Sequence, residues 1–152
     1  MKESIHKTAA IILAAGSGSR MGISTTKQRV IINGKSILRR SIEAFEASKS
    51  ITSITVVCRE DEIEFVKGEC IGCNKVAGAV IGGKTRAESA AIGFAAIPQG
   101  SKAVMIHDAA RCLITPAEID LVADAVYKYG AATASTNVVD SLKMCDENGM
   151  IK

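Results

Sequence analysis

This chain has few aromatic residues and only a small excess of positive charge. Among 152 residues there is no Trp, and there are only two Tyr and three Phe. With so few aromatic side chains, we expect a core built from Ile, Val, Leu and Ala. The formal net charge is +3, from 19 Lys and Arg against 16 Asp and Glu. This small excess, without a basic run or an aromatic–basic patch, argues against a nucleic-acid partner.

The chain also lacks a long apolar segment and an even number of cysteines. The apolar run after the charged N-terminus is too short for a signal peptide or a membrane anchor, so we expect a cytoplasmic protein without membrane association. Five cysteines, an odd number, are typical of reduced thiols in that compartment. Cys70 and Cys73 have C-x-x-C spacing. No second pair accompanies them, which argues against a zinc or redox site.

Apolar strand-like segments alternate with helical patterns along what we expect to be one domain, residues 1–152. The expected strands are 9–15, 54–58, 76–81, 103–106 and 131–139, with a short extended piece at 30–32, and the expected helices are 36–48, 60–67, 86–97 and 116–129. Strands that are apolar on both faces and separated by helices predict an α/β fold. We therefore expect a Rossmann-like three-layer sandwich with a mostly parallel sheet.

Polar, glycine-rich segments follow three of the expected strands, at 16–27, 82–89 and 107–111. Ligands of parallel sheets bind beyond the carboxyl ends of the strands, so the three segments predict one shared site. The first segment carries Arg20 and Lys27 among small residues. Its freed backbone N–H groups and two cations suit a row of phosphates. A surface loop that only turns the chain is the alternative.

Two other phosphate-binding motifs fail on spacing. A dinucleotide fingerprint needs G-x-G-x-x-G opening a helix. Here the third glycine, Gly22, comes one position late, and no helical pattern follows until Ser36. A Walker loop needs Gly-Lys-Ser/Thr, whereas Ile23 follows Gly22. These departures argue against a nicotinamide-dependent dehydrogenase and against a P-loop enzyme.

The last residues have the pattern of a β-hairpin. Residues 141–145 are expected to be extended, Asp146-Glu147-Asn148-Gly149 is a turn signal, and 150–152 begin a return strand. We expect 137–152 to be the start of a protruding β-arm. Such a short strand leaves an open edge, so the expectation is either a domain incomplete at its C-terminus or a hairpin that pairs with another subunit.

Four motifs in this order resemble the 2-C-methyl-D-erythritol 4-phosphate cytidylyltransferases of the non-mevalonate isoprenoid pathway. They are A-A-G-S-G-S-R-M-G with K-Q at 14–28, G-G-K-T-R-A-E-S at 82–89, H-D-A-A-R at 107–111 and D-S-L-K at 140–143. The resemblance covers essentially the whole chain and implies a nucleotidyltransferase-type fold. It implies transfer of CMP from CTP to a sugar-alcohol phosphate, with Mg²⁺ as cofactor, release of pyrophosphate, and a homodimer formed through the β-arm.

The resemblance also implies roles for individual residues. Arg20 and Lys27 match the catalytic cations that contact the triphosphate. Asp108 matches the carboxylate that holds Mg²⁺, Arg111 is the candidate for the acceptor's phosphate, and Ser141 keeps the hydroxyl of an acceptor-binding motif. His107 is expected to be a packed strand-end residue. The expected nucleotide-binding residues are Ala14, Ala15, Gly16, Gly18, Gly82, Gly83 and Ser89.

Some positions depart from the family pattern. Thr26 stands where proline is usual, so the first loop loses a rigid point. Lys84 and Thr85 stand where an acid is frequent, and Cys112 follows H-D-A-A-R in place of proline. The family also continues beyond the length of this chain. The alternatives that stay open are a ribitol-5-phosphate cytidylyltransferase and a truncated nucleotide-binding module without turnover.

Overall fold

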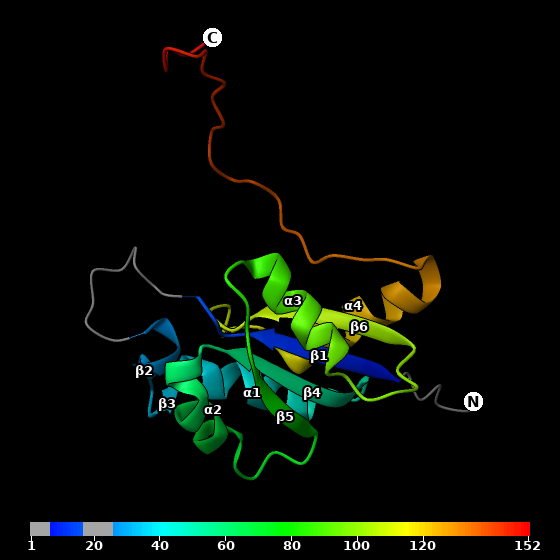
Figure 1. The fold of residues 1–152 in the computed structure, drawn as a ribbon. Helices are drawn as coiled ribbons and strands as arrows, with labels where there is room; N and C mark the ends of the chain where they lie inside the picture. Colours follow the sequence, from blue (N-terminus) through cyan, green and yellow to red (C-terminus); the bar gives the residue numbers. More distant parts are fainter. Residues whose placement is uncertain (1–6, 17–25) are drawn as a thin grey trace.

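Four parallel strands in the order β5-β4-β1-β6 form the central sheet of the computed structural model, which describes residues 7–16 and 26–152 (Figure 1). The strands are β1 (Thr8–Leu13), β4 (Ile51–Cys58), β5 (Val76–Ile81) and β6 (Ala103–Asp108). β1 pairs with β4 on one side and with β6 on the other, so that Leu13 lies opposite both Val57 and Asp108. The carboxyl ends of these strands therefore meet at one edge.

Helices cover both faces of the sheet and complete the predicted three layers. The helices are α1 (Ile37–Ala47), α2 (Ile63–Cys70), α3 (Arg86–Ala95) and α4 (Pro116–Tyr129). Side chains of α1, α2 and α4 share one buried cluster with β1 and β4. A smaller cluster joins α3 to the opposite face of β1, β4 and β5. The expected aliphatic core is confirmed, because Phe45 is the single aromatic residue among the buried hydrophobic residues that the structure describes.

A glycine allows α3 to lie close to the sheet. A Cβ atom at Gly93 would stand 2.5 Å from Ile11 Cγ2 and 2.8 Å from Val57 Cγ2. Real Cβ atoms do not approach so closely in a well-packed interior, so any larger residue would push the helix outward. Because α3 follows the glycine pair at the end of β5, its close contact with the sheet also fixes residues 82–89.

Capping residues begin and end the helices where the sequence predicts. Ser36 Oγ accepts from Arg39 N at the start of α1, and Gly130, with a φ of 86°, follows α4. The turn between β2 (Ile31–Ile32) and β3 (Lys35–Ser36) uses Asn33 and Gly34 in the left-handed region, as the Asn-Gly pair predicts.

The helix expected over 60–67 differs in its bounds. The 3-10 turn η3 (Glu60–Glu62) precedes α2, and α2 continues past Gly68 to Cys70. The helix ends before Gly72, whose φ is 80°. The half-buried Cys70 packs against the main core, and this contact outweighs the low helix propensity of Gly68.

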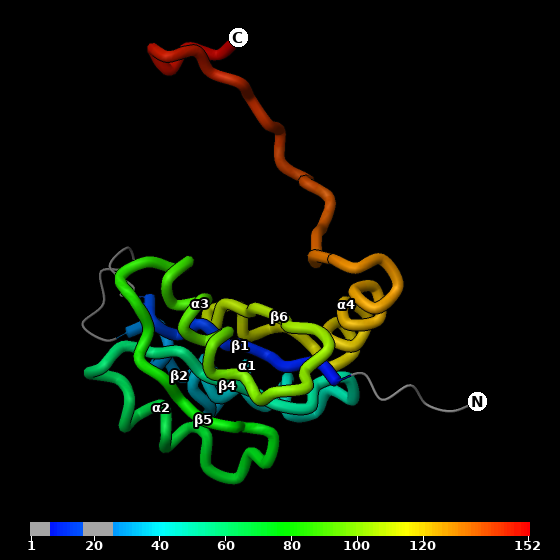
Figure 2. Tube along the Cα trace, turned by 45° about the vertical axis from the view of Figure 1, so that its right-hand side comes forward, coloured from blue at the N-terminus to red at the C-terminus, as the bar shows by residue number. Residues whose placement is uncertain are grey.

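The strand expected over 131–139 is wrong. Residues 131–145 are exposed, and the segment runs away from the sheet in both views (Figures 1 and 2). An extended segment becomes a strand only when a neighbouring strand pairs with its backbone. No described strand lies beside this segment. The predicted terminal turn is present, since Asp146 N donates to Met150 O at 2.9 Å and Cys145 bridges Ile151.

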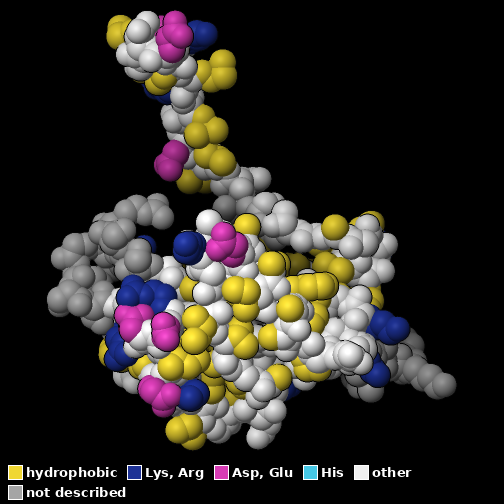
Figure 3. All heavy atoms as spheres, in the orientation of Figure 1, with side chains coloured by type: hydrophobic (Ala, Val, Ile, Leu, Met, Phe, Trp, Pro, Cys, Tyr) yellow, Lys and Arg dark blue, Asp and Glu magenta, His cyan; other side chains and the backbone are white. Residues whose placement is uncertain are grey.

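One face of the sheet is only partly covered. On the side that carries α3, many hydrophobic side chains reach the surface (Figure 3). Ile106, whose register partner Ile11 lies in the α3 cluster, is 45% exposed, and Phe94 of α3 is 59% exposed. In the described part of the chain, no helix is both long enough and apolar enough to cross a membrane.

The carboxylate of Asp120 anchors α4 to the turn between α1 and β4. It accepts from Ser48 Oγ at 2.6 Å and from the backbone N–H groups of Lys49 and Ser50. Burial raises the pKa of Asp120, but these hydrogen bonds outweigh it and lower the pKa below its usual range. The ionised form is therefore favoured in the folded state.

We predict that Asp120→Asn lowers the free energy of unfolding at pH 7 by about 1–2 kcal/mol. The stabilisation by the carboxylate is present above the pKa of the unfolded chain and disappears as the pH falls through the lower folded pKa. The difference from the wild type should therefore shrink below pH 4 in urea titrations followed by circular dichroism. Asp140→Asn, in an exposed segment, is the control, and an equal loss at pH 3 and pH 7 would contradict the prediction.

Candidate nucleotide-binding site

The end of β1 leads directly into the first predicted loop. Ala14 continues the strand, because its N–H donates to Val57 O at 2.7 Å. Ala14 is buried, Ala15 is half-buried and Gly16 is exposed, so the chain emerges at the carboxyl edge of the sheet. The predicted residues Gly18 and Arg20 lie outside the described residues.

The chain re-enters the described structure beside the same strand end. The 3-10 turn η2 (Lys27–Arg29) is tied to β1 by the buried Gln28, whose Nε2 donates to Ala14 O at 2.6 Å and to Gly16 O at 3.3 Å. Gln28 Oε1 is buried and has no hydrogen-bond partner in the described parts of the chain. Lys27 is half-buried and forms no ion pair with a described carboxylate. Its charge is therefore not neutralised by a described carboxylate.

Thr26 compensates for the missing proline at the end of this loop. Its φ of −72° is the value that a proline ring imposes. Its Oγ1 donates to Glu62 Oε2 at 3.3 Å. The expected loss of a rigid point is thus offset by a side-chain hydrogen bond.

The glycine pair at the end of β5 packs directly against Ala15. A Cβ atom at Gly82 would stand 3.1 Å from Ala15 Cβ and 2.7 Å from Ser89 Oγ. The buried Ser89 accepts from Gly83 N at 3.2 Å, so α3 holds the turn in place. At the position where an acid is frequent, Thr85 is the N-cap of α3. Five of the predicted nucleotide-binding residues, Ala14, Ala15, Gly82, Gly83 and Ser89, therefore lie together.

Asp108 ends β6 opposite Leu13, beside the same end of β1. Its carboxylate is shared by two arginines: Arg86 Nε donates to Oδ1 at 3.0 Å, and Arg111 Nε lies 3.4 Å from Oδ2. Arg111 is an exposed cation, as a phosphate-binding residue would be. Sequence reasoning left the role of Arg86 open, because only the strand order brings the start of α3 to the end of β6.

His107 supports the segment that carries Asp108 and Arg111. Its ring is buried against Phe45, with centroids 5.0 Å apart, and its Nε2 is 3.2 Å from Arg111 O. Burial lowers the pKa of His107 below its usual range, so the ring is neutral and Nε2 donates to the carbonyl. The prediction of a packed strand-end residue is confirmed.

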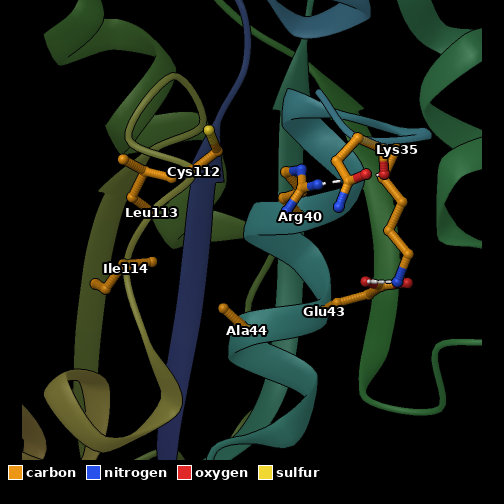
Figure 4. Close-up of a pocket in the computed structure, with 8 residues that line it drawn as sticks. Lys35, Arg40, Glu43, Ala44, Cys112, Leu113 and Ile114 are labelled. Carbon is orange, nitrogen blue, oxygen red and sulfur yellow. Dashed lines mark hydrogen bonds and ion pairs between the residues drawn. The ribbon is translucent and has the colours of Figure 1, made fainter. Parts of the chain in front are cut away.

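Two cavities lie near these strand ends. One, of about 370 Å³, contains predicted nucleotide-binding residues in its lining, which is Ala15, Arg59, Glu60, Asp61, Ile81, Gly82, Gly83 and Lys84. The other, of about 500 Å³, lies between α1 and the segment after Arg111 (Figure 4). Lys35 is paired with Glu43 there, and Arg40 donates to Ile32 O. The larger cavity contains none of the predicted site residues, so we place the nucleotide site at the smaller one.

The segments that carry Lys27, Asp108 and Arg111 all adjoin the carboxyl edge of the sheet near Ala15, although none of these three residues lines either of the two cavities. The structure does not bring Ser141 there, because Ser141 lies in the exposed segment that leaves the domain (Figure 2). Among the described residues, no group of three or more His, Cys, Asp or Glu is placed to hold a metal. Asp108 is therefore the candidate for a metal held by one carboxylate.

We predict that Gly82→Ala destabilises the fold by about 1–3 kcal/mol, because the added methyl would overlap Ser89 and crowd Val57 Cγ1 at 3.0 Å. Nucleotide binding should weaken as well. Gly68→Ala is the matched control, since its Cβ meets nothing within 4 Å and it favours the helix. Urea unfolding followed by circular dichroism measures the stability of the two variants. Equal stability would contradict the tight packing at Gly82.

Comparisons with known proteins agree with this arrangement. The family model of 2-C-methyl-D-erythritol 4-phosphate cytidylyltransferase matches residues 8–152. The enzyme of that name from Pelotomaculum thermopropionicum is 36% identical over 150 residues, which are 97% of this chain and 63% of that protein. The one from Acaryochloris marina is 38% identical over 144 residues, 93% of this chain and 61% of that protein. The chain spans less than two thirds of the length of these relatives.

A solved structure has the same fold. The crystal structure of 4-diphosphocytidyl-2C-methyl-D-erythritol synthase from Anaerococcus prevotii superposes with a TM-score of 0.83 at 26% sequence identity, covering 96% of this chain and 62% of that one. With the glycine pair, the strand-end carboxylate and both ends of the first loop at one edge of the sheet, these matches lead to one assignment. The chain belongs to the 2-C-methyl-D-erythritol 4-phosphate cytidylyltransferase family.

Proposed function

We propose that this chain is the nucleotide-binding part of a cytidylyltransferase that transfers CMP from CTP to 2-C-methyl-D-erythritol 4-phosphate in isoprenoid biosynthesis. Family membership supports the reaction. The observation that supports the proposal is the convergence of three segments on the end of β1: Gln28, next to Lys27, binds Ala14 O, Asp108 lies opposite Leu13, and Gly82 packs against Ala15. A cation, a carboxylate and a close backbone approach are what a nucleoside triphosphate requires there.

The chemistry needs positioned charge more than an activated nucleophile. A phosphate oxygen of the acceptor attacks the α-phosphorus of CTP, the bond from that phosphorus to the bridging oxygen breaks, and pyrophosphate leaves. The acceptor phosphate is already anionic near neutral pH, so the barrier is mainly the repulsion of two anions and the charge that develops on the α-phosphate. We assign Lys27 and Arg20 to that charge, and Arg111 to the acceptor's phosphate, because arginine binds such anions with two parallel hydrogen bonds.

The glycine pair suits recognition of the cytosine base. Gly82 and Gly83 carry no side chains of their own, Glu88 packs beside Gly83, and Ser89 holds the turn in place through its hydrogen bond with Gly83 N. Ala14 and Ala15 then pack near the base and ribose, with Gly16 and Gly18 beside the phosphates. Such a preformed cleft recognises a base at low entropic cost.

Asp108 fits Mg²⁺, which is bound through one or two carboxylates while phosphate oxygens and waters complete its shell. The ion would neutralise charge on the triphosphate. Asp108 would hold it from the end of β6, and this requires Arg86 and Arg111 to turn from the carboxylate towards phosphate oxygens. Both arginines are more than 60% exposed, so their side chains are free to move.

We further propose a cytoplasmic homodimer formed through the β-arm that begins at residue 137. All five cysteines are free thiols, which supports the compartment. The segment carries exposed apolar side chains, with Val139 93% and Leu142 81% exposed, and such side chains favour a covering partner. In this arrangement Ser141 would serve an acceptor site in the dimer rather than the site of its own domain.

Two alternatives stay open. A nucleotide-binding module without turnover is favoured by the position of Ser141, which lies in the exposed segment away from the candidate site. A ribitol-5-phosphate cytidylyltransferase would use the same phosphate-binding residues. Calorimetry with CTP and Mg²⁺ beside a pyrophosphate-release assay separates the cases: release that requires CTP, Mg²⁺ and methylerythritol phosphate supports the proposal, and binding without release supports the module. Release with ribitol phosphate alone supports the other enzyme.

We predict that Lys27→Ala and Arg20→Ala each lower turnover by about 10²–10³-fold, the loss typical of a preorganised charge-stabilising group. The melting temperature of Lys27→Ala should stay within about 2 °C of the wild type, because Lys27 is not fully buried and forms no ion pair with a described carboxylate. Asp108→Asn should raise the Mg²⁺ concentration needed for half-maximal rate. Lys102→Ala, an exposed lysine before β6, is the control. Unchanged turnover in Lys27→Ala would remove the role given to that residue.

A further inference from the structure

The exit of the first loop is held by a buried carboxylate that the proposed chemistry does not use. Glu62, the last residue of η3, is only 7% exposed. It accepts from Arg29 Nε at 3.0 Å and 3.3 Å through its two oxygens, and from Thr26 Oγ1 at 3.3 Å. A buried carboxylate is stable only when it is paired and hydrogen-bonded, and both partners of this one flank Lys27.

The partners of Glu62 are themselves held in place. The guanidinium of Arg29 lies over the Phe65 ring of α2, 4.3 Å from its centroid. The backbone of the turn is closed by Arg29 N donating to Thr26 O and Val30 N donating to Lys27 O. On the other side of the turn, Gln28 is bound to the end of β1. Lys27 therefore lies between two attachments, one to the start of α2 and one to the central strand.

We propose that Glu62 is a positioning residue for Lys27. It fixes the backbone on both sides of this lysine, so that the ammonium group meets the α-phosphate at the moment charge develops. Thr26 has a φ of −72°, the value that a proline ring would impose, and its hydrogen bond to Glu62 restrains the backbone in place of such a ring. The inference rests on the proposed function for its kinetic part only, since the attachment itself concerns the fold of residues 26–30.

The attachment can be removed without changing the size of the side chains. Glu62→Gln removes the charge that pairs with Arg29, and Thr26→Val removes only the hydroxyl. Glu64→Gln is the matched control: it removes the same charge two residues later, from an exposed position paired with Lys67. Thr26→Pro restores the backbone restraint by another route, so the double variant of Glu62→Gln with Thr26→Pro tests rescue.

We expect Glu62→Gln and Thr26→Val to lower kcat by tenfold or more while KM for CTP changes less than threefold. A misplaced lysine loses transition-state contacts before it loses ground-state binding. Thr26→Pro in the Glu62→Gln background should regain at least threefold of kcat. A merely structural role would not give this split or this rescue. Glu64→Gln should stay within twofold of the wild type in both constants.

Amide hydrogen exchange supplies a second readout that does not require turnover. Exchange at the N–H groups of Arg29 and Val30 should be at least tenfold faster in Glu62→Gln than in Glu64→Gln, at equal melting temperature. If Glu62→Gln matches the control in exchange, the inference is overturned, whatever the kinetics. If the exchange changes as expected but the wild type releases no pyrophosphate, the proposed function fails and the attachment of the loop stands.

Discussion

The parallel pairing of β1 with both β4 and β6 is the constraint on which the rest of this molecule depends. It places Leu13 opposite Val57 and Asp108, and thereby brings the ends of three strands to one edge of the sheet. The first loop, the glycine pair and the carboxylate all follow from that register. A shift of one residue in the β1–β6 register would turn Asp108 to the other face of the sheet. The backbone hydrogen bonds of the sheet therefore determine which side chains lie at the candidate site.

Two acidic side chains hold the arginines at this edge of the sheet in defined orientations. Glu62 holds Arg29 and Thr26 on either side of Lys27, and Asp108 holds Arg86 and Arg111 across the opposite side of the site. Lys27 itself forms no ion pair with a described carboxylate. The exposed pairs of Asp108 contribute little to stability, so their main effect is to orient the two arginine side chains, whereas the carboxylate of Glu62 is buried.

Most of the sheet and its ligand-binding edge could be predicted from the sequence, because apolar strands, caps and glycine punctuation are local signals. The bounds of β5 and the capping residues Ser36 and Gly130 needed only neighbouring residues. The predictions that failed concern contacts between residues that are distant in the sequence. Residues 131–139 have the composition of a strand, yet strand formation depends on a partner that no local pattern specifies.

Side-chain contacts between distant elements were equally beyond local reasoning. Arg86 and Asp108 are 22 residues apart, and Thr26 and Glu62 are 36 apart, so only the folded topology brings them together. At position 26 the backbone does adopt a φ that proline would favour. The sequence did not reveal that a hydroxyl and a buried carboxylate supply part of the backbone restraint here.

The shared carboxylate of Asp108 has a consequence for the order in which reactants assemble. With one guanidinium on each oxygen, it has little affinity left for a bare divalent ion arriving from solution. Under the proposed function, phosphate oxygens of the two substrates would draw these guanidinium groups away and free the carboxylate oxygens. Under that proposal the metal ion would enter together with the nucleotide, because Asp108 is free to hold an ion only after an anion has drawn Arg86 from it.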